Sequence, residues 1–173
     1  MRRTARLRAQ ARGGAWFAQE YIAGPTYLVG ALCHAGRALR VYAGEKLEQF
    51  PPRTGPAIRL RSRDHAALVG LGVAVFRELQ WTGLVSADVM QRPDGTFVLL
   101  EVNPRPWGSI AAASTAGVDL FGPFAELIAG RVPAPDLRFT PDAECMIFPR
   151  YLMADQYRGL GGVARALRDL CSE

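Results

Sequence analysis

Long apolar runs are missing from this sequence. No stretch approaches the roughly 20 consecutive apolar residues that a membrane-spanning helix needs, and no apolar signal-peptide core follows the N-terminus. We therefore predict a cytoplasmic protein with no membrane partner. A length of 173 residues is enough for one domain with its own core.

Cysteine and histidine are also scarce. The chain has three cysteines and two histidines, and its cysteines lie far apart with no C-x-x-C spacing. Such a pattern supports neither a disulfide framework nor a zinc site. We expect reduced thiols and structural histidines.

Lysine is almost absent, because Lys46 is the one lysine beside 20 arginines. Five of these arginines precede the first acidic residue, and the remaining 16 basic residues balance 16 acidic ones. The body of the chain therefore has no basic stripe of the kind that binds nucleic acid, and we expect no nucleic-acid partner. Residues 1–15 are predicted to be an arginine-rich stub, a truncated helix or tail, and 16–173 to be one domain.

Turn residues divide the domain into strands and helices. Alternation and β-branched or aromatic content predict strands at 16–22, 26–34, 37–43, 57–61, 83–91, 96–103 and 144–151. Helical spacing predicts helices at 62–80, 109–116, 119–129 and 161–171. Prolines and glycines predict a long loop at 44–56. Because strands and helices are mixed without βαβ regularity, we predict an α+β fold with a largely antiparallel sheet flanked by helices.

The two strands at 83–91 and 96–103 form the clearest predicted hairpin. If its turn pairs Arg92 with Gly95, Glu101 faces Ser86 and lies diagonal to Asp88, about 7–8 Å away. Alternation then gives one wholly apolar face, made of Val85, Ala87, Val89, Val98, Leu100 and Val102. The opposite face carries Ser86, Asp88, Met90, Phe97, Leu99, Glu101 and Asn103.

Two acids and an amide on that second face favour a magnesium site. Carboxylate and amide oxygens are the ligands that this hard cation prefers, and it keeps waters and substrate phosphates as further ligands. The apolar neighbours Met90, Phe97 and Leu99 are expected to border an adenine ring. The alternative from the residues alone is a solvent-facing sheet surface, where scattered acids are common.

The run from 99 to 109, with the sequence LLEVNPRPWGS, closely resembles the C-terminal signature of ATP-grasp ligases. It is most similar to the branch related to carbamoyl-phosphate synthase and the carboxylate–amine ligases. Segments 19–24, 46–56 and 81–88 resemble, in order, the adenine-edge strand, the flexible phosphate loop and the strand of the first metal acid. The resemblance covers residue 16 to the C-terminus and implies the C-terminal portion of an ATP-grasp domain.

The resemblance implies a role for each candidate residue. Asp88, Glu101 and Asn103 are expected to bind Mg²⁺, as two ions, with Mn²⁺ as an alternative. Arg105 is expected to neutralise charge on the γ-phosphate or acyl phosphate, and Lys46 to contact phosphates. The implied nucleotide-binding residues are Gln19, Glu20, Tyr21, Ile22, Met90 and Leu100.

Each of these roles has a structural alternative. Glu20 would be an exposed strand residue, Arg105 a donor to loop carbonyls, and Lys46 a solvated loop side chain. Trp107 is expected to pack rather than to contact a ligand.

The implied activity is an ATP- and Mg²⁺-dependent carboxylate–amine ligase that activates a carboxylate as an acyl phosphate. The resemblance also implies a lobe or separate subunit that supplies the phosphate-binding lysines absent here. Thr26 stands where many relatives carry an acid for the ribose. The alternatives are a non-catalytic ATP/Mg²⁺-binding module and a degenerate remnant. The intact set of acids, amide and arginine argues against the remnant.

Overall fold

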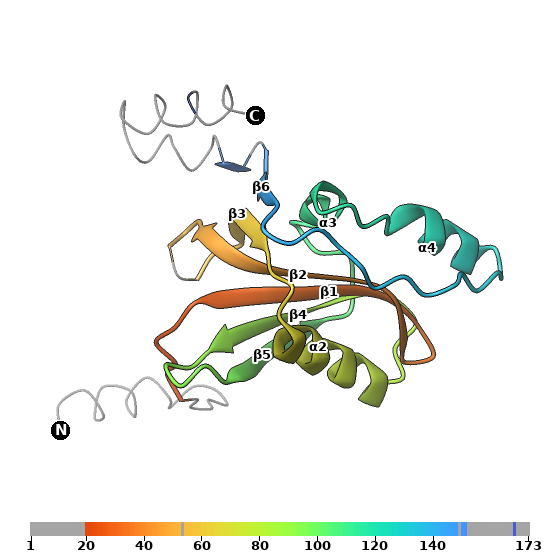
Figure 1. Cartoon of the computed structure of the whole chain (residues 1–173), viewed down its shortest axis with the longest axis horizontal. Coiled ribbons are helices and arrows are strands. Elements are labelled where there is room, and N and C mark those ends of the chain that lie inside the picture. The colour runs from red at the N-terminus through yellow and green to blue at the C-terminus, as the bar shows by residue number, and fades with distance from the viewer. Residues whose placement is uncertain (1–19, 53, 149, 152–167, 169–173) are drawn as a thin grey trace, which may run out of the picture.

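The computed structural model describes residues 20–52, 54–148, 150–151 and 168. Their six strands form one sheet in the order β5-β4-β1-β2-β3-β6, and every neighbouring pair is antiparallel (Figure 1). The strands are β1 (Thr26–His34), β2 (Arg37–Gln49), β3 (Ala57–Ser62), β4 (Gly83–Gln91), β5 (Phe97–Asn103) and β6 (Glu144–Met146). The predicted α+β class with an antiparallel sheet is confirmed.

Helices lie on both faces of this sheet. Helix α2 (Ala66–Glu78) packs on one face, while α3 (Ala111–Thr115) and α4 (Phe121–Ile128) lie on the other (Figure 1). The predicted helices at 62–80, 109–116 and 119–129 are thus present with shorter bounds. Within the described ranges, no helix combines the length and the apolar character needed to cross a membrane.

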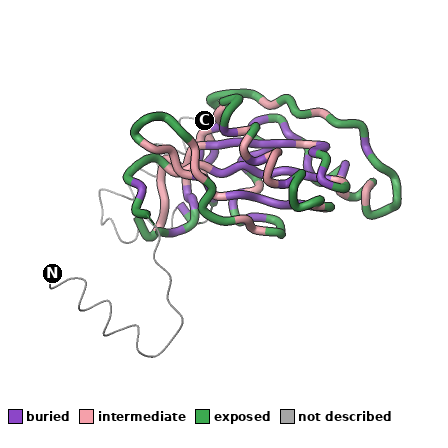
Figure 2. The backbone as a smooth tube through the Cα atoms, turned by 90° about the horizontal axis from the view of Figure 1, so that it is seen from below, coloured by how far each residue is buried: buried purple, intermediate pink, exposed green. Residues whose placement is uncertain are grey.

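Two separate apolar cores result from the alternation of side chains along the central strands. In β1, Leu28 and Leu32 point into the core beneath α3 and α4, whereas Val29 and Ala31 point into the core beneath α2. All four are 4% exposed or less, and Figure 2 shows that the buried positions follow the strands. The sheet is therefore covered on both sides at its centre.

Some predicted segments need correction, and others lie wholly or partly outside the described residues. The predicted loop at 44–56 is wrong for 44–49, because β2 continues to Gln49 while pairing with β1 and β3. The predicted strand at 144–151 ends at Met146, where its pairing with β3 ends. Residues 20–22 are not in a strand. The stub 1–15, residues 16–19 and, apart from 168, the helix predicted at 161–171 lie outside the described residues.

The two cysteines in the described ranges, Cys33 and Cys145, are free, in agreement with the predicted reduced thiols, and both are buried. Burial raises the pKa of the Cys33 thiol to about 12. Cys33 is therefore a core residue with no thiolate chemistry at neutral pH.

Two glycines in α2 provide a test of how closely this helix packs on the sheet. A Cβ on Gly72 would lie 2.5 Å from Cγ1 of Val29, whereas a Cβ on Gly70 would meet nothing within 4 Å. We expect Gly72→Ala to destabilise the fold by about 1–3 kcal/mol through overpacking. Gly70→Ala, the matched control, should stabilise it by about 0.5–1 kcal/mol through helix propensity. Urea unfolding measures both, and equal stabilisation by the two variants would contradict the close packing.

Candidate functional site

A β-bulge in the β4–β5 hairpin sets the geometry of the candidate site. Near the turn, Met90 pairs with Val98, but the register shifts between Asp88 and Val89. Leu100 is the extra residue, and beyond it Asp88 lies directly opposite Glu101. The shift returns Glu101 to the face of Asp88, since without it Glu101 would pair with Ala87 and point toward α2.

The register predicted from the sequence is therefore wrong in its details. Arg92 pairs with Thr96 rather than Gly95, because its amide donates to the Thr96 carbonyl at 2.8 Å. Phe97 and Leu99 consequently do not border the candidate nucleotide pocket. Phe97 packs in the α2 core, with its ring 5.3 Å from that of Tyr27. Asp88 and Glu101 are direct neighbours across the strands, not diagonal ones.

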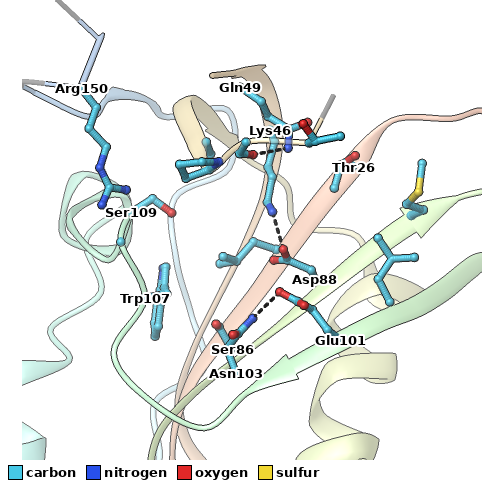
Figure 3. A pocket seen from close by; sticks show the side chains of 18 of the residues that line it. Thr26, Lys46, Gln49, Ser86, Asp88, Glu101, Asn103, Trp107, Ser109 and Arg150 are labelled. Atoms are coloured by element: carbon cyan, nitrogen blue, oxygen red, sulfur yellow. Dashed lines mark hydrogen bonds and ion pairs between the residues drawn. The ribbon is translucent and has the colours of Figure 1, made fainter. Parts of the chain in front are cut away.

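A pocket of about 560 Å³ opens on the sheet face opposite α2 (Figure 3). It brings together Lys46, Asp88, Met90, Leu100, Glu101, Asn103 and Arg105 from the set of predicted site residues. Leu100 lines this pocket and Val98 shares the face of Met90, so the apolar face expected from simple alternation is broken at both positions. The physical reason is the turn, which pairs Arg92 with Thr96 and so shifts the register by one residue.

Lys46 reaches Asp88 from two strands away. Its Nζ lies 2.7 Å from Oδ2 of Asp88, and the two side chains are 6% and 22% exposed. Figure 3 shows the lysine extended along the pocket toward the carboxylate. Lys46 is thus a buried, paired strand residue, so the alternative of a solvated loop lysine is wrong.

The second carboxylate belongs to a chain of hydrogen bonds at the strand end. Asn103 Nδ2 donates to Oε1 of Glu101 at 2.8 Å, and Nη2 of Arg105 donates to Oδ1 of Asn103 at 3.3 Å. Arg105 also donates through Nη1 to the Pro106 carbonyl at 3.1 Å. The arginine therefore makes a loop-carbonyl bond while lining the pocket.

The residues expected to bind adenine are less closely assembled. Ile22 is buried, whereas Tyr21 is 80% exposed. Glu20 pairs with Arg92 through Nη2 and Oε2 at 2.6 Å. None of these three lines the pocket, and Gln19 lies outside the described residues.

Other residues line the pocket that the sequence analysis gave no ligand-binding role. Ser86 and Trp107 line the pocket. The Ser86 hydroxyl and the Trp107 indole nitrogen are buried without a hydrogen-bond partner in the described part of the chain. Trp107 packs closely against Gly30, where a Cβ would lie 2.3 Å from its ring. A glycine inside a strand was the signal for this close approach. Arg150, which also lines the pocket, had no such signal.

The donor set fits a hard divalent cation that retains water or phosphate ligands. Asp88, Glu101 and Asn103 supply oxygen atoms on one face of the sheet, and all three residues line the pocket. Among the described residues no cluster of three His, Cys, Asp or Glu side chains is suited to a metal ion. Mg²⁺ usually keeps water and phosphate ligands, so a site with two carboxylates and open coordination positions suits it better than a site made entirely of protein ligands would.

Comparison with known families identifies the architecture. Residues 14–145 match the sequence model of the family described as ATP-grasp in the biosynthetic pathway with Ter operon. The chain belongs to this ATP-grasp family. Membership implies ATP binding, in agreement with the resemblance of the 99–109 segment. No curated protein matches the sequence.

Solved structures support the ATP-grasp fold. The biotin carboxylase domain of a single-chain bacterial carboxylase matches with a TM-score of 0.59, 21% identity, and coverage of 82% of this chain and 34% of its own. The Campylobacter jejuni biotin carboxylase–β,γ-ATP complex gives a TM-score of 0.56 and 13% identity, covering 73% and 30%.

The ADP complex of PurK, an N5-carboxyaminoimidazole ribonucleotide synthetase, gives a TM-score of 0.54 and 15% identity, covering 70% and 33%. The chain therefore spans about a third of the length of each of these three structures. At these identities, the matches establish the fold alone.

The Lys46–Asp88 pair predicts a specific pattern of stability. Asp88→Ala leaves a buried ammonium without its partner, so we expect a loss of about 3 kcal/mol. Lys46→Met removes the buried charge and should cost less, and in the double variant the two losses should not add. Glu101→Ala, on the facing exposed carboxylate, is the control and should change stability by less than about 1 kcal/mol. Urea unfolding of the four variants gives the coupling energy; additive losses would contradict a coupled pair.

Proposed function

We propose that this chain forms the nucleotide- and metal-binding part of an ATP- and Mg²⁺-dependent carboxylate–amine ligase. The observation that carries the proposal is the facing pair Asp88 and Glu101, compensated by Lys46, inside the pocket of an ATP-grasp family member. Carboxylates directly opposite one another across a sheet repel. The facing carboxylates therefore favour a bound cation at this position.

In the proposed complex, Asp88 and Glu101 hold Mg²⁺, and Asn103 contributes to a second ion. The bound cation would neutralise charge on the β- and γ-phosphates, which is the main requirement of phosphoryl transfer. Asn103 Nδ2 holds the Glu101 carboxylate in place at 2.8 Å. Both carboxylate residues line the pocket.

Two apolar side chains and a main-chain segment would position the nucleotide. Met90 and Leu100 line the pocket beside the two acids and are suited to contact the base. Glu20, Tyr21 and Ile22 remain the proposed adenine-edge segment, through their main chain.

The proposed reaction activates a carboxylate substrate at the cationic part of the pocket. An oxygen of the substrate carboxylate attacks the γ-phosphorus of ATP. The bond between the γ-phosphorus and the β-phosphate oxygen breaks, so the products of this step are an acyl phosphate and ADP. The amine then attacks the acyl carbon, releasing phosphate and a proton. Arg105 lines the pocket and is placed to offset the negative charge of this transfer. Arg150 lines the same pocket beside Ser109, away from Asp88 (Figure 3), and would face the substrate carboxylate.

We propose that a further lobe, on the same polypeptide or a separate subunit, completes the enzyme. The matched structures are about three times as long as the matching segment, and Lys46 is the one lysine present. Additional phosphate-binding cations would come from that lobe.

Calorimetric titration of ATP, with Mg²⁺ and with a chelator, tests the nucleotide and metal site. We expect Mg²⁺-dependent binding that Asp88→Asn and Glu101→Gln each weaken by at least about tenfold, equivalent to about 1.4 kcal/mol. Both substitutions keep side-chain shape and remove only charge. The control is Glu78→Gln, on an α2 side chain that is 77% exposed.

Binding that ignores Mg²⁺, or that survives both pocket substitutions, would overturn the assignment of the acids. Circular dichroism and urea unfolding of each variant separate lost binding from lost folding.

A further inference from the structure

Lys46 occupies the position on Asp88 that a metal ion would need. Strands β2 and β4 are separated by β1, so the lysine crosses a span of about 9–10 Å between strand axes. It ends with Nζ 2.7 Å from Oδ2 of Asp88. A side chain extended this far over a neighbouring strand is held by the charge that it meets.

The facing carboxylates explain why the ammonium lies there. Asp88 and Glu101 lie directly opposite each other, and like charges in that arrangement destabilise a sheet. Glu101 receives a neutral amide hydrogen bond from Asn103, so Lys46 supplies the positive charge at this pair. In the described part of the chain, Asp88 makes no ion pair with any other cation.

We infer that Lys46 and a divalent cation compete for Asp88, so that metal loading releases the lysine into the pocket. The inference rests on the proposed nucleotide and metal site. A divalent ion on Asp88 repels the neighbouring ammonium and takes its acceptor. The Lys46 side chain is 6% exposed, and a buried ammonium without a partner is costly.

The displaced ammonium needs a new acceptor in the same pocket. The phosphates of a nucleotide supply one, because they would lie against the same ion and present several anionic oxygens. Metal and nucleotide therefore support each other's binding through Lys46. Metal alone binds weakly because it must leave the ammonium unpaired, and the nucleotide removes that penalty. This coupling is reciprocal, as linkage requires.

The first experiment measures Mn²⁺ binding without nucleotide, by electron paramagnetic resonance of the free ion. We expect Lys46→Met to bind Mn²⁺ about tenfold more tightly than the wild type, a factor within the range typical of coupled sites. Glu101→Gln should weaken Mn²⁺ binding in both backgrounds. Arg138→Met, which removes the cation of an exposed ion pair outside the pocket, is the charge-matched control and should change nothing.

A second measurement follows Lys46 directly. Because the chain has one lysine, ¹⁵N-lysine labelling yields a single side-chain ammonium signal. We expect Mg²⁺ to move this signal, ATP with Mg²⁺ to move it to a different position, and Asp88→Asn to remove the response to Mg²⁺ alone.

The outcomes separate this inference from the proposed function. Mn²⁺ affinity that is equal or weaker in Lys46→Met, yet still sensitive to Glu101→Gln, would overturn the competition and leave the metal site standing. A stationary lysine signal on Mg²⁺ saturation would do the same. No Mn²⁺ binding in either protein would overturn both the competition and the metal site.

Discussion

The pairing of one lysine with two facing carboxylates is the interaction on which the site depends. Asp88 and Glu101 face each other because the bulge at Leu100 shifts the pairing of β4 and β5 by one residue. Their repulsion is tolerable because Lys46 arrives from β2 with a compensating charge. The β4–β5 pair, its bulge at Leu100 and Lys46 on β2 together place these charges in the pocket.

The remainder of the fold supplies a rigid support for this arrangement. Helix α2 buries one face of the sheet so closely that Gly72 has no room for a side chain against Val29. On the opposite face, Trp107 lies on Gly30 and closes the apolar core at the edge of the pocket. The polar residues therefore stand on a packed sheet, which limits how far the carboxylates can move apart.

Family membership and site chemistry contribute different parts of the functional conclusion. The matched structures share the fold at 21% identity or less, so they place the chain among ATP-grasp architectures without specifying a substrate. The chemical content comes from this chain's own residues: two acids and an amide suited to Mg²⁺, with Arg105 and Arg150 lining the same pocket. The substrate carboxylate and its amine partner are proposals that follow from this combination.

The sequence by itself determined the α+β class and the hairpin, because alternation and turn chemistry are local properties. It also predicted that Asp88, Glu101 and Asn103 share a face, but in the structure that sharing depends on the bulge at Leu100. It misplaced Phe97 and Leu99, because it paired Arg92 with Gly95, whereas in the structure Arg92 pairs with Thr96. It also placed Lys46 in a flexible loop, because the prolines after Gln49 favoured a loop over the whole segment 44–56, whereas β2 continues to Gln49. Only the tertiary structure decided that Lys46 pairs with Asp88. That contact joins residues 42 positions apart across an intervening strand, and no local pattern encodes it.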